Sequence, residues 1–275
     1  LFKMNELGYI TDSEYQDALN QEIIIKIGKK KQQGISTYFM DKLKQDVVNS
    51  FMQKGYTEDE ATDILYNGGL RIYSTLNTNI QRILEKEFED KNNFPGSYTD
   101  ENDIIQPQGA MVIMDQYTGA VNGLVGGRGI GGNRIYNRAL NPRQPGSSIK
   151  PLAVYLPALS KGVTAGDVYD DSPREDGKGG YWPKNVGSYK GPITVRELIE
   201  RSSNVGAVKV GETLSSTPEQ SINTMIGFLQ KMGFTTIVTR DQNTRINDEN
   251  LSLTLGGMTK GLTPLEITSA YTAIA

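Results

Sequence analysis

Residues 143–151 read Arg-Gln-Pro-Gly-Ser-Ser-Ile-Lys-Pro, and they join a turn to the start of an apolar helical pattern. Gly146 allows the backbone to turn sharply, because a residue without a side chain adopts angles that others avoid. The apolar pattern predicts a helix over residues 147–160. Ser147 is expected at the N-terminus of this helix, with Lys150 one turn later on the same face.

The composition restricts the chemistry that is open to Ser147. The 275 residues include no histidine and no cysteine, which excludes a Ser-His-Asp triad, a thiol nucleophile, a disulfide and a His- or Cys-based zinc site. A lysine can activate a serine only if its pKa falls, and burial and a helix N-terminus both disfavour the ammonium form. We therefore predict Ser147 as the nucleophile, Lys150 as its base and the Ser147 N–H as one oxyanion-hole donor, with no metal and no cofactor.

A second polar element, Ser202-Ser203-Asn204, lies between two predicted helices. On one turn, Ser202 can pass a proton and Asn204 can hold a substrate amide. Plainer interpretations stay open, because Ser-x-x-Lys is expected about once by chance in a chain of this length. The first motif is then an ordinary helix start and the second a polar junction. The same spelling at Ser221-Ile222-Asn223 falls inside a predicted helix and is interpreted as a coincidence.

Helices joined by turns account for most of the remaining pattern. Capping boxes at Thr11 and Thr57 open short helices, and Gly68 ends the second of these. Pro157 is expected to kink or shorten the helix that starts at Ser147. Further helices are predicted over residues 36–54, 80–88, 194–201, 205–214, 218–232 and 264–275, strands over 70–76, 110–114 and 120–125, and loops over 91–107 and 166–192.

Charge and hydropathy limit the partners. The net charge of −3 gives no electrostatic support for a nucleic-acid partner, and the lysine run 29–31 is typical of a solvated face or linker.

Gly127-x-Gly129-x-x-Gly132 has the glycine spacing of a dinucleotide-binding fingerprint, but the polar, proline-containing residues after it predict a loop instead of the required helix. No run of about 18 apolar residues occurs, so a membrane contact is expected only through an anchor outside this sequence.

Several segments resemble the transpeptidase domain of class A, bifunctional penicillin-binding proteins. The nucleophile segment 143–151 and the Ser-x-Asn element at 202–204 are similar to two of the motifs of that family. The resemblance covers most of residues 70–275. It is also carried by Met111-Val112-Ile113-Met114-Asp115, Thr118-Gly119-Ala120-Val121, Tyr181-Trp182-Pro183-Lys184-Asn185, Thr194-Val195-Arg196-Glu197-Leu198, Leu255-Gly256-Gly257 and Gly261-Leu262-Thr263-Pro264-Leu265-Glu266.

The resemblance implies a fold and a domain order. The fold is a helix-rich α/β domain of the α+β type, like β-lactamases and transpeptidases, around an antiparallel sheet. It places the transpeptidase domain at residues 106–275, truncated at its C-terminus, and a small linker module at residues 21–105. Residues 1–20 resemble the tail of the glycosyltransferase domain that precedes this module in the family.

The resemblance also implies a reaction. Ser147 attacks the D-Ala-D-Ala end of a peptidoglycan stem peptide while Lys150 takes its proton. D-Alanine leaves, and an amine of a neighbouring stem peptide resolves the acyl-enzyme. Ser202 and Asn204 complete the proton relay and hold the substrate. β-Lactam antibiotics would acylate the same serine.

The implied surroundings of the site extend to further residues and partners. Trp182 and Asn185 are expected to line the substrate cleft. The peptidoglycan substrate is a lipid-linked precursor or nascent glycan on the extracytoplasmic face of the bacterial cell membrane. The third family motif, Lys-Thr-Gly or Lys-Ser-Gly, is absent, and Thr259-Lys260-Gly261 is only a scrambled look-alike. We expect that motif, with a second oxyanion donor, in a segment downstream of Ala275.

Two other functional classes stay open. A class A β-lactamase forms the same acyl-enzyme, but it needs a glutamate that activates water and an aspartate at the position of Ser203. Glu175 lies in a glycine-rich loop without the usual companion asparagine, and it matches poorly. The second class is a β-lactam sensor or a scaffold with an inactive site. Labelled penicillin distinguishes these classes by whether an adduct forms and how fast it turns over.

Overall fold

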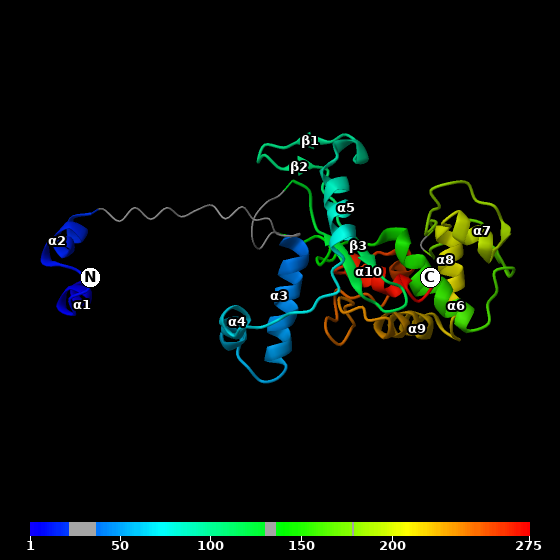
Figure 1. Ribbon diagram of the computed structural model, residues 1–275. Coiled ribbons are helices and arrows are strands. Elements are labelled where there is room, and N and C mark those ends of the chain that lie inside the picture. Colours follow the sequence, from blue (N-terminus) through cyan, green and yellow to red (C-terminus); the bar gives the residue numbers. More distant parts are fainter. Residues whose placement is uncertain (22–36, 130–135, 178) are drawn as a thin grey trace. The chain divides into compact units, whose positions relative to one another are not determined.

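The structure is a computed structural model that describes residues 1–21, 37–129, 136–177 and 179–275 (Figure 1). The lysine run 29–31 and Gly132 of the glycine-rich motif lie outside these residues. The chain divides into two units, residues 1–34 and residues 35–275. The domain boundaries expected from the family resemblance stay a prediction.

The first unit contains two short helices in its described part. α1 spans Phe2–Glu6 and α2 spans Asp12–Asn20. Thr11 caps α2 as predicted, because its hydroxyl accepts the Glu14 N–H at 3.3 Å and the Glu14 carboxylate accepts the Thr11 N–H at 2.7 Å. Neither helix buries a residue, so these local bonds, rather than a core, support them.

The second unit begins with a pair of helices. α3 (Thr37–Met52) and α4 (Glu58–Asn67) confirm the two predicted helices. Thr57 caps α4 in a second capping box, and Gly68 ends it. These ends follow from local sequence alone, since a capping side chain bonds to the backbone three residues away.

An antiparallel hairpin forms one core with α3 and α5 (Thr78–Glu89). β3 (Met111–Met114) and β4 (Val121–Val125) pair as predicted. The buried Gln81 side chain ties α5 to β4, because its amide accepts the Leu124 N–H at 2.8 Å and donates to the Leu124 carbonyl at 3.1 Å. The buried side chains of this core are Tyr38, Phe39, Leu84, Phe88, Leu124, Val125 and Ala139.

Residues 70–76 do not form the predicted strand. Within the segment, Thr75 donates its hydroxyl proton to Val121 O of β4 at 2.7 Å, and Asn77, just after the segment, donates its N–H to Asn122 O at 2.9 Å. The prediction was wrong because alternating side chains do not show whether a neighbouring edge accepts a continuous ladder of hydrogen bonds.

Residues 91–107 are also more ordered than the predicted loop. They contain the helical turn η1 (Lys91–Asn93) and a hairpin of β1 (Tyr98–Thr99) and β2 (Ile105–Gln106). The buried Arg128 guanidinium holds this segment, donating to Phe88 O at 3.0 Å, Pro107 O at 2.9 Å and Ser97 Oγ at 3.2 Å. A polar composition indicated a loop because it does not reveal a distant buried partner.

A larger core lies among the helices after residue 145 (Figure 1). α7, α8 and α9 confirm the predicted helices to within one or two residues, and α10 confirms the last one but ends at Tyr271. The elements are η2 (Gly146–Ile149), η3 (Pro151–Tyr155), α6 (Leu156–Ser160), β5 (Val168–Asp170), β6 (Pro192–Thr194), α7 (Val195–Glu200), α8 (Asn204–Glu212), α9 (Pro218–Lys231), η4 (Leu251–Leu255) and α10 (Pro264–Tyr271).

The predicted helix over residues 147–160 is not a single regular α-helix. It consists of a 3-10 turn, a π-helical turn and the short α-helix α6. Pro151 and Pro157 each stand in the first turn of a new segment, because proline has no N–H to donate to a preceding turn. Ile149 and the four residues from Leu152 to Tyr155 nevertheless belong to the larger core, and Leu152 is fully buried.

The described strands form three two-stranded antiparallel sheets, β1–β2, β3–β4 and β5–β6. Helices outnumber strands and supply most of both cores. The predicted class, a helix-rich α+β fold with antiparallel strands, is confirmed. In this fold the segment that carries Ser147 and Lys150 runs directly into the larger core.

Candidate active site

Lys150 is the buried centre of the site. Its side chain is only 2% exposed, because the residue lies between η2 and η3 at the edge of the larger core. Its Nζ donates to Ser202 O at 2.6 Å and to Asn204 Oδ1 at 2.6 Å, and it lies 3.2 Å from Ser202 Oγ. The structure therefore brings together three of the residues predicted from two separate motifs.

These contacts suit a lysine that acts as a base. Burial lowers the pKa of Lys150 to about 8, so about a tenth of it is free amine at pH 7. Ser202 O and Asn204 Oδ1 can only accept hydrogen bonds, and they take two N–H groups of the amine. The remaining lone pair can then accept a proton from the Ser202 hydroxyl.

Ser147 lies in η2, and its side chain is exposed. The Lys150 N–H bonds to Ser147 O, which places both residues on one turn. Within the described part of the chain, the Ser147 hydroxyl makes no hydrogen bond to the Lys150 amine. The neighbouring Ser148 hydroxyl is occupied, since it donates to Pro145 O at 2.7 Å. Of the two adjacent serines, Ser147 is therefore the one whose hydroxyl is not bonded to the backbone of this turn.

Two contacts with residues 256–262 hold the turn before Ser147. Arg143 and Leu262 exchange backbone hydrogen bonds of 2.9 and 2.8 Å. The Gln144 side chain bonds in both directions to the Met258 backbone, and its Oε1 accepts the Met258 N–H at 2.8 Å. Sequence reasoning assigned Gln144 no role, because its partner is more than a hundred residues away.

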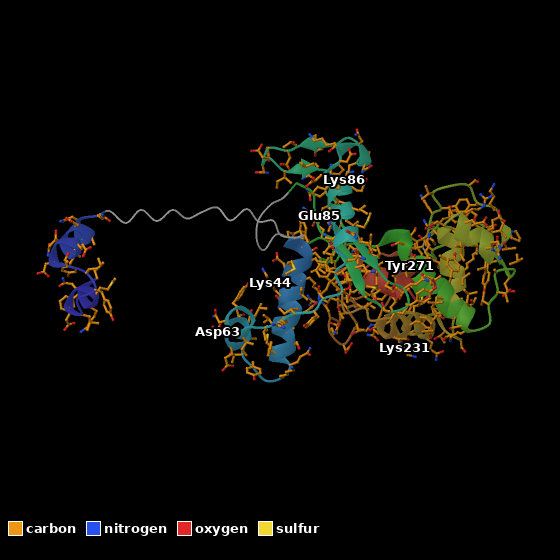
Figure 2. All side chains as sticks on the ribbon, viewed as in Figure 1. Lys44, Asp63, Glu85, Lys86, Lys231 and Tyr271 are labelled. Carbon is orange, nitrogen blue, oxygen red and sulfur yellow. The ribbon has the colours of Figure 1, made fainter. Side chains whose placement is uncertain are left out.

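Close approach of two backbones explains the glycines in this contact. Gly256 and Gly261 have positive φ angles of 81° and 83°. A Cβ atom on Gly256 would lie 2.3 Å from Gly146 O, and one on Gly261 would lie 2.2 Å from Arg143 O. Any side chain at either position would push away the turn formed by residues 143–148. Tyr271 of α10 (Figure 2) supports the same turn, donating its hydroxyl proton to Ser148 O at 2.7 Å.

Ser202 faces Lys150 from a strained turn between α7 and α8. Its φ angle of +50° is uncommon for a residue with a side chain. The carbonyl that follows is the one that accepts from Lys150 Nζ. Strain of this kind persists only where the surrounding structure enforces it, and it is frequent at functional sites.

Asn204 is the first residue of α8, and both polar atoms of its side chain form a hydrogen bond. Its Oδ1 accepts from Lys150 Nζ, and its Nδ2 donates to Lys184 O at 2.8 Å. The Asn185 side chain caps the same helix end, where its Oδ1 accepts the Asn204 and Val205 N–H groups at 2.9 and 3.1 Å. Asn185 thus positions Asn204 directly.

A cavity of about 210 Å³ lies beside this turn. Its lining includes Ser202 and Asn185. Trp182 does not line this cavity. It is half-buried, and its backbone N–H donates to Arg174 O at 2.9 Å. Substrate binding by Trp182 and Asn185 stays a prediction.

Asp171 is a buried residue that sequence reasoning missed. It also lines the cavity, it is 1% exposed, and its carboxylate contacts Ser203 and Asn185. The sequence contains the doublet Asp170-Asp171 in a predicted loop, without a signal for which of the two is buried.

Within the described ranges, no group of three or more acidic side chains is placed to hold a metal ion.

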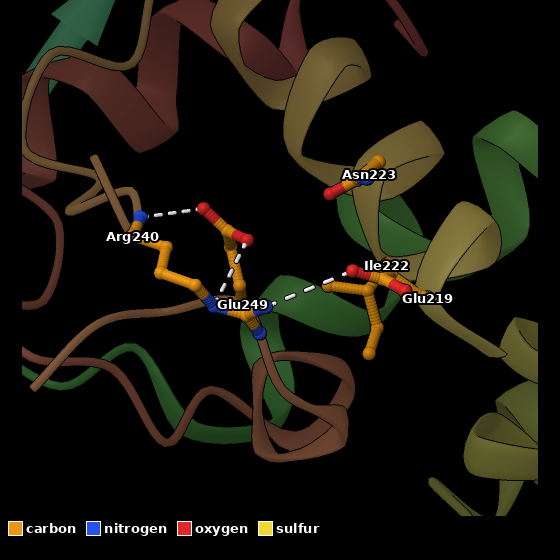
Figure 3. Close-up of a pocket in the computed structure, with 5 residues that line it drawn as sticks. All are labelled: Glu219, Ile222, Asn223, Arg240 and Glu249. Carbon is orange, nitrogen blue, oxygen red and sulfur yellow. Dashed lines mark hydrogen bonds and ion pairs between the residues drawn. The ribbon is translucent and has the colours of Figure 1, made fainter. Parts of the chain in front are cut away.

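A second cavity, of about 280 Å³, is lined by residues of α9 and of the segment after it (Figure 3). Arg240 reaches Glu219 at 3.6 Å and Glu249 at 3.7 Å across it.

The second Ser-x-Asn sequence, Ser221-Ile222-Asn223, lies within α9. The Ser221 hydroxyl is buried and donates to Glu212 O at 2.9 Å, which supports the interpretation of that motif as a coincidence.

Comparison with known proteins identifies the family. The model of the penicillin binding protein transpeptidase domain matches residues 109–275. The chain belongs to the penicillin-binding protein transpeptidase family. The predicted resemblance to the transpeptidase domain of penicillin-binding proteins is thereby confirmed.

Individual relatives agree with this assignment. Penicillin-binding protein 1A of Clostridium perfringens is 35% identical over 254 residues, which cover 85% of this chain and 30% of that protein. The structure of penicillin-binding protein 1A from Haemophilus influenzae matches with a TM-score of 0.63 at 22% identity, over 98% of this chain and 50% of that one. The PonA1 protein from Mycobacterium tuberculosis, in complex with penicillin V, matches with a TM-score of 0.65 at 21% identity, over 86% and 58%.

The chain spans about a third of the length of the penicillin-binding proteins 1A that it matches in sequence. Among the residues that the structure describes, none of the helices has the length and apolar character needed to cross a membrane.

Proposed function

We propose that this chain carries the acyl-transfer site of a D-Ala-D-Ala transpeptidase that cross-links peptidoglycan stem peptides and is inhibited by β-lactams. The observation that carries the proposal is Lys150, a buried amine whose pKa falls to about 8 and which is bound by both Ser202 and Asn204, one turn away from the exposed Ser147. A similar structure holds penicillin V, which agrees with a β-lactam ligand.

Acylation begins at Ser147. Its Oγ attacks the carbonyl carbon of the penultimate D-alanine, and its proton passes to the Lys150 amine, with Ser202 Oγ as the relay at 3.2 Å from Nζ. The peptide C–N bond breaks, the leaving D-alanine amine takes a proton from the Lys150 ammonium, and an ester remains on Ser147. The contact between Asn204 Oδ1 and Lys150 keeps the amine oriented through both proton transfers.

In deacylation Ser147 becomes the leaving group, and Lys150 again accepts a proton and then donates it. An amine of a neighbouring stem peptide attacks the ester carbon and loses a proton to Lys150, and Ser147 Oγ leaves with that proton. The Ser147 N–H supplies one oxyanion donor. These 275 residues contain no Lys-Thr-Gly or Lys-Ser-Gly sequence, so we propose that a further segment of the protein supplies the second donor.

The cellular setting is part of the proposal. The reaction takes place on the extracytoplasmic face of the bacterial membrane, where peptidoglycan is assembled. An anchor and a glycosyltransferase domain would belong to other parts of the same protein, as in a bifunctional enzyme. Residues 1–20 would be the tail of that domain, residues 21–105 the linker and residues 106–275 the transpeptidase domain.

Labelled penicillin tests this function in the full-length protein. We expect a stable adduct on Ser147, located by mass spectrometry of peptides, that is lost in Ser147→Ala. Lys150→Ala should slow acylation by about 10²- to 10⁴-fold, because a general base contributes that much. Ser148→Ala is the matched control: this serine is adjacent and also exposed, but its hydroxyl bonds to Pro145 O, and labelling should persist.

The same experiment separates the alternatives. Fast turnover of the adduct would favour a β-lactamase. A stable adduct without cross-linking of stem peptides would favour a β-lactam sensor. No adduct on Ser147 would contradict the catalytic assignment and favour a scaffold.

A further inference from the structure

We propose that Asp171 is a positioning residue of the transpeptidase site, which holds the turn that presents Ser202 and Asn204 to Lys150. The inference rests on the proposed function and extends it to a residue outside the recognised motifs. Asp171 follows β5, more than twenty residues before that turn in sequence, and it is 1% exposed. A carboxylate buried this deeply needs hydrogen-bond donors. Two of its donors, Ser203 of the turn and Asn185 beside it, also bond to the start of α8.

Two side chains connect Asp171 to the start of α8. The carboxylate accepts the Ser203 hydroxyl proton and, at 2.9 Å, the Asn185 side-chain N–H. It also accepts the Lys190 backbone N–H at 3.3 Å. Ser203 is itself buried, so water does not compete strongly for these bonds.

The charge on Asp171 fixes the direction of both side chains. A carboxylate only accepts hydrogen bonds, so the Ser203 hydroxyl and the Asn185 amide must turn their hydrogens towards it. Their oxygens then face the opposite way, towards the free N–H groups at the start of α8. Asn185 Oδ1 accepts from Asn204 and Val205, and Ser203 Oγ accepts from Gly206 at 2.8 Å. The N–H groups of the first three residues of α8 are thus paired.

This arrangement determines the positions of the two oxygen atoms that accept hydrogen bonds from Lys150 Nζ. Asn204 is the first residue of α8, so fixing the helix end fixes the Asn204 Oδ1 that accepts from Lys150 Nζ at 2.6 Å. Ser203 also anchors Ser202, which lies beside it with a φ angle of +50° and directs its carbonyl at Nζ. Without the anchor, Ser202 can relax to an ordinary conformation and turn this carbonyl away.

The test is Asp171→Asn in the full-length protein, with the rate of labelled penicillin acylation as the measurement. An asparagine has the same shape, but its NH₂ group would face one of the donors. We expect acylation to slow by about 10²-fold, the effect of a misplacement of about 1 Å in a catalytic site. The loss should lie in the acylation rate constant and not in the dissociation constant of the non-covalent penicillin complex.

Asp170→Asn is the matched control. Asp170 is the neighbouring carboxylate, it is exposed, and it pairs with Lys209 of α8 at 3.3 Å, away from the helix start. Its variant should acylate at the parental rate. Melting temperatures of both variants show whether each is folded at the assay temperature.

A second variant tests whether Asp171 acts through Ser203. Ser203→Ala alone should slow acylation by about 10-fold, and the double variant should be less impaired than the product of the two single effects, because both changes break one connection. If Asp171→Asn does not fold, the result for Ser203→Ala decides. Slow acylation with a folded protein supports the inference, and the parental rate overturns it.

The outcomes keep this inference separate from the proposed function. If the parent protein forms no adduct on Ser147, the proposed function fails. If the parent is acylated and folded Asp171→Asn is acylated as fast, only the positioning role fails. A loss confined to penicillin binding, or a double variant that shows the full product of both effects, would also overturn that role.

Discussion

The turn that carries Ser147 and the turn that carries Ser202 and Asn204 meet at Lys150, but different contacts hold them. The first turn lies against the backbone of residues 256–262, with glycines at the closest points. The second is held by a buried network of polar side chains around Asp171. The first turn should therefore fail when volume is added, and the second when a polar group is removed.

The largest expected effect comes from adding one methyl group where residues 256–262 contact the turn before Ser147. Gly261→Ala would place a Cβ 2.2 Å from Arg143 O at a φ angle of +83°. We expect the free energy of unfolding to fall by about 2–5 kcal/mol, the sum of the costs of left-handed backbone strain and of overpacking. Chemical denaturation measures this loss, and labelled penicillin should show slower acylation in the protein that remains folded.

Gly233→Ala isolates the contact from the backbone strain. Gly233 also has a positive φ angle, of +89°, but a Cβ there meets nothing within 4 Å. Its variant should lose only about 1–2 kcal/mol and keep the parental acylation rate. Equal losses in Gly233→Ala and Gly261→Ala would contradict the close backbone packing described for the nucleophile turn.

A smaller effect separates the two features of Ser202, its hydroxyl and its strain. Ser202→Ala and Ser202→Gly both remove the hydroxyl that lies 3.2 Å from Lys150 Nζ, so both should slow acylation, by about 10- to 10²-fold. Only glycine adopts the φ angle of +50° freely, so its variant should be more stable than the alanine variant by about 1 kcal/mol. Parental acylation by either variant would remove Ser202 from the proton relay.

Local signals in the sequence predicted much of the fold. The capping boxes predicted at Thr11 and Thr57 lie where the helices begin, because a cap depends on residues only three apart. The strand predicted at residues 70–76 is absent, because a ladder needs a partner edge that alternation cannot reveal. The helix after Ser147 is broken at Pro151 and Pro157, of which sequence reasoning weighed only the second.

The sequence predicted only those site residues that belong to short motifs. Ser-x-x-Lys and Ser-x-Asn named Ser147, Lys150, Ser202 and Asn204, and the structure joins the last three around one amine. Neither Gln144 nor Asp171 had a signal, because each acts on a partner that only the tertiary fold brings near. An acidic residue in a loop is usually solvated, and its burial cannot be inferred from its neighbours in sequence.

The pH dependence of Ser147 acylation tests the central claim most directly. Burial lowers the pKa of Lys150 to about 8, and the amine must be unprotonated to accept the serine proton. The rate of labelled penicillin acylation should therefore rise about tenfold per pH unit below this pKa and level off above it, with the adduct on Ser147. A rate that does not change with pH between about 6 and 9, or an adduct on another residue, would contradict the assignment of Ser147 and Lys150 as nucleophile and base.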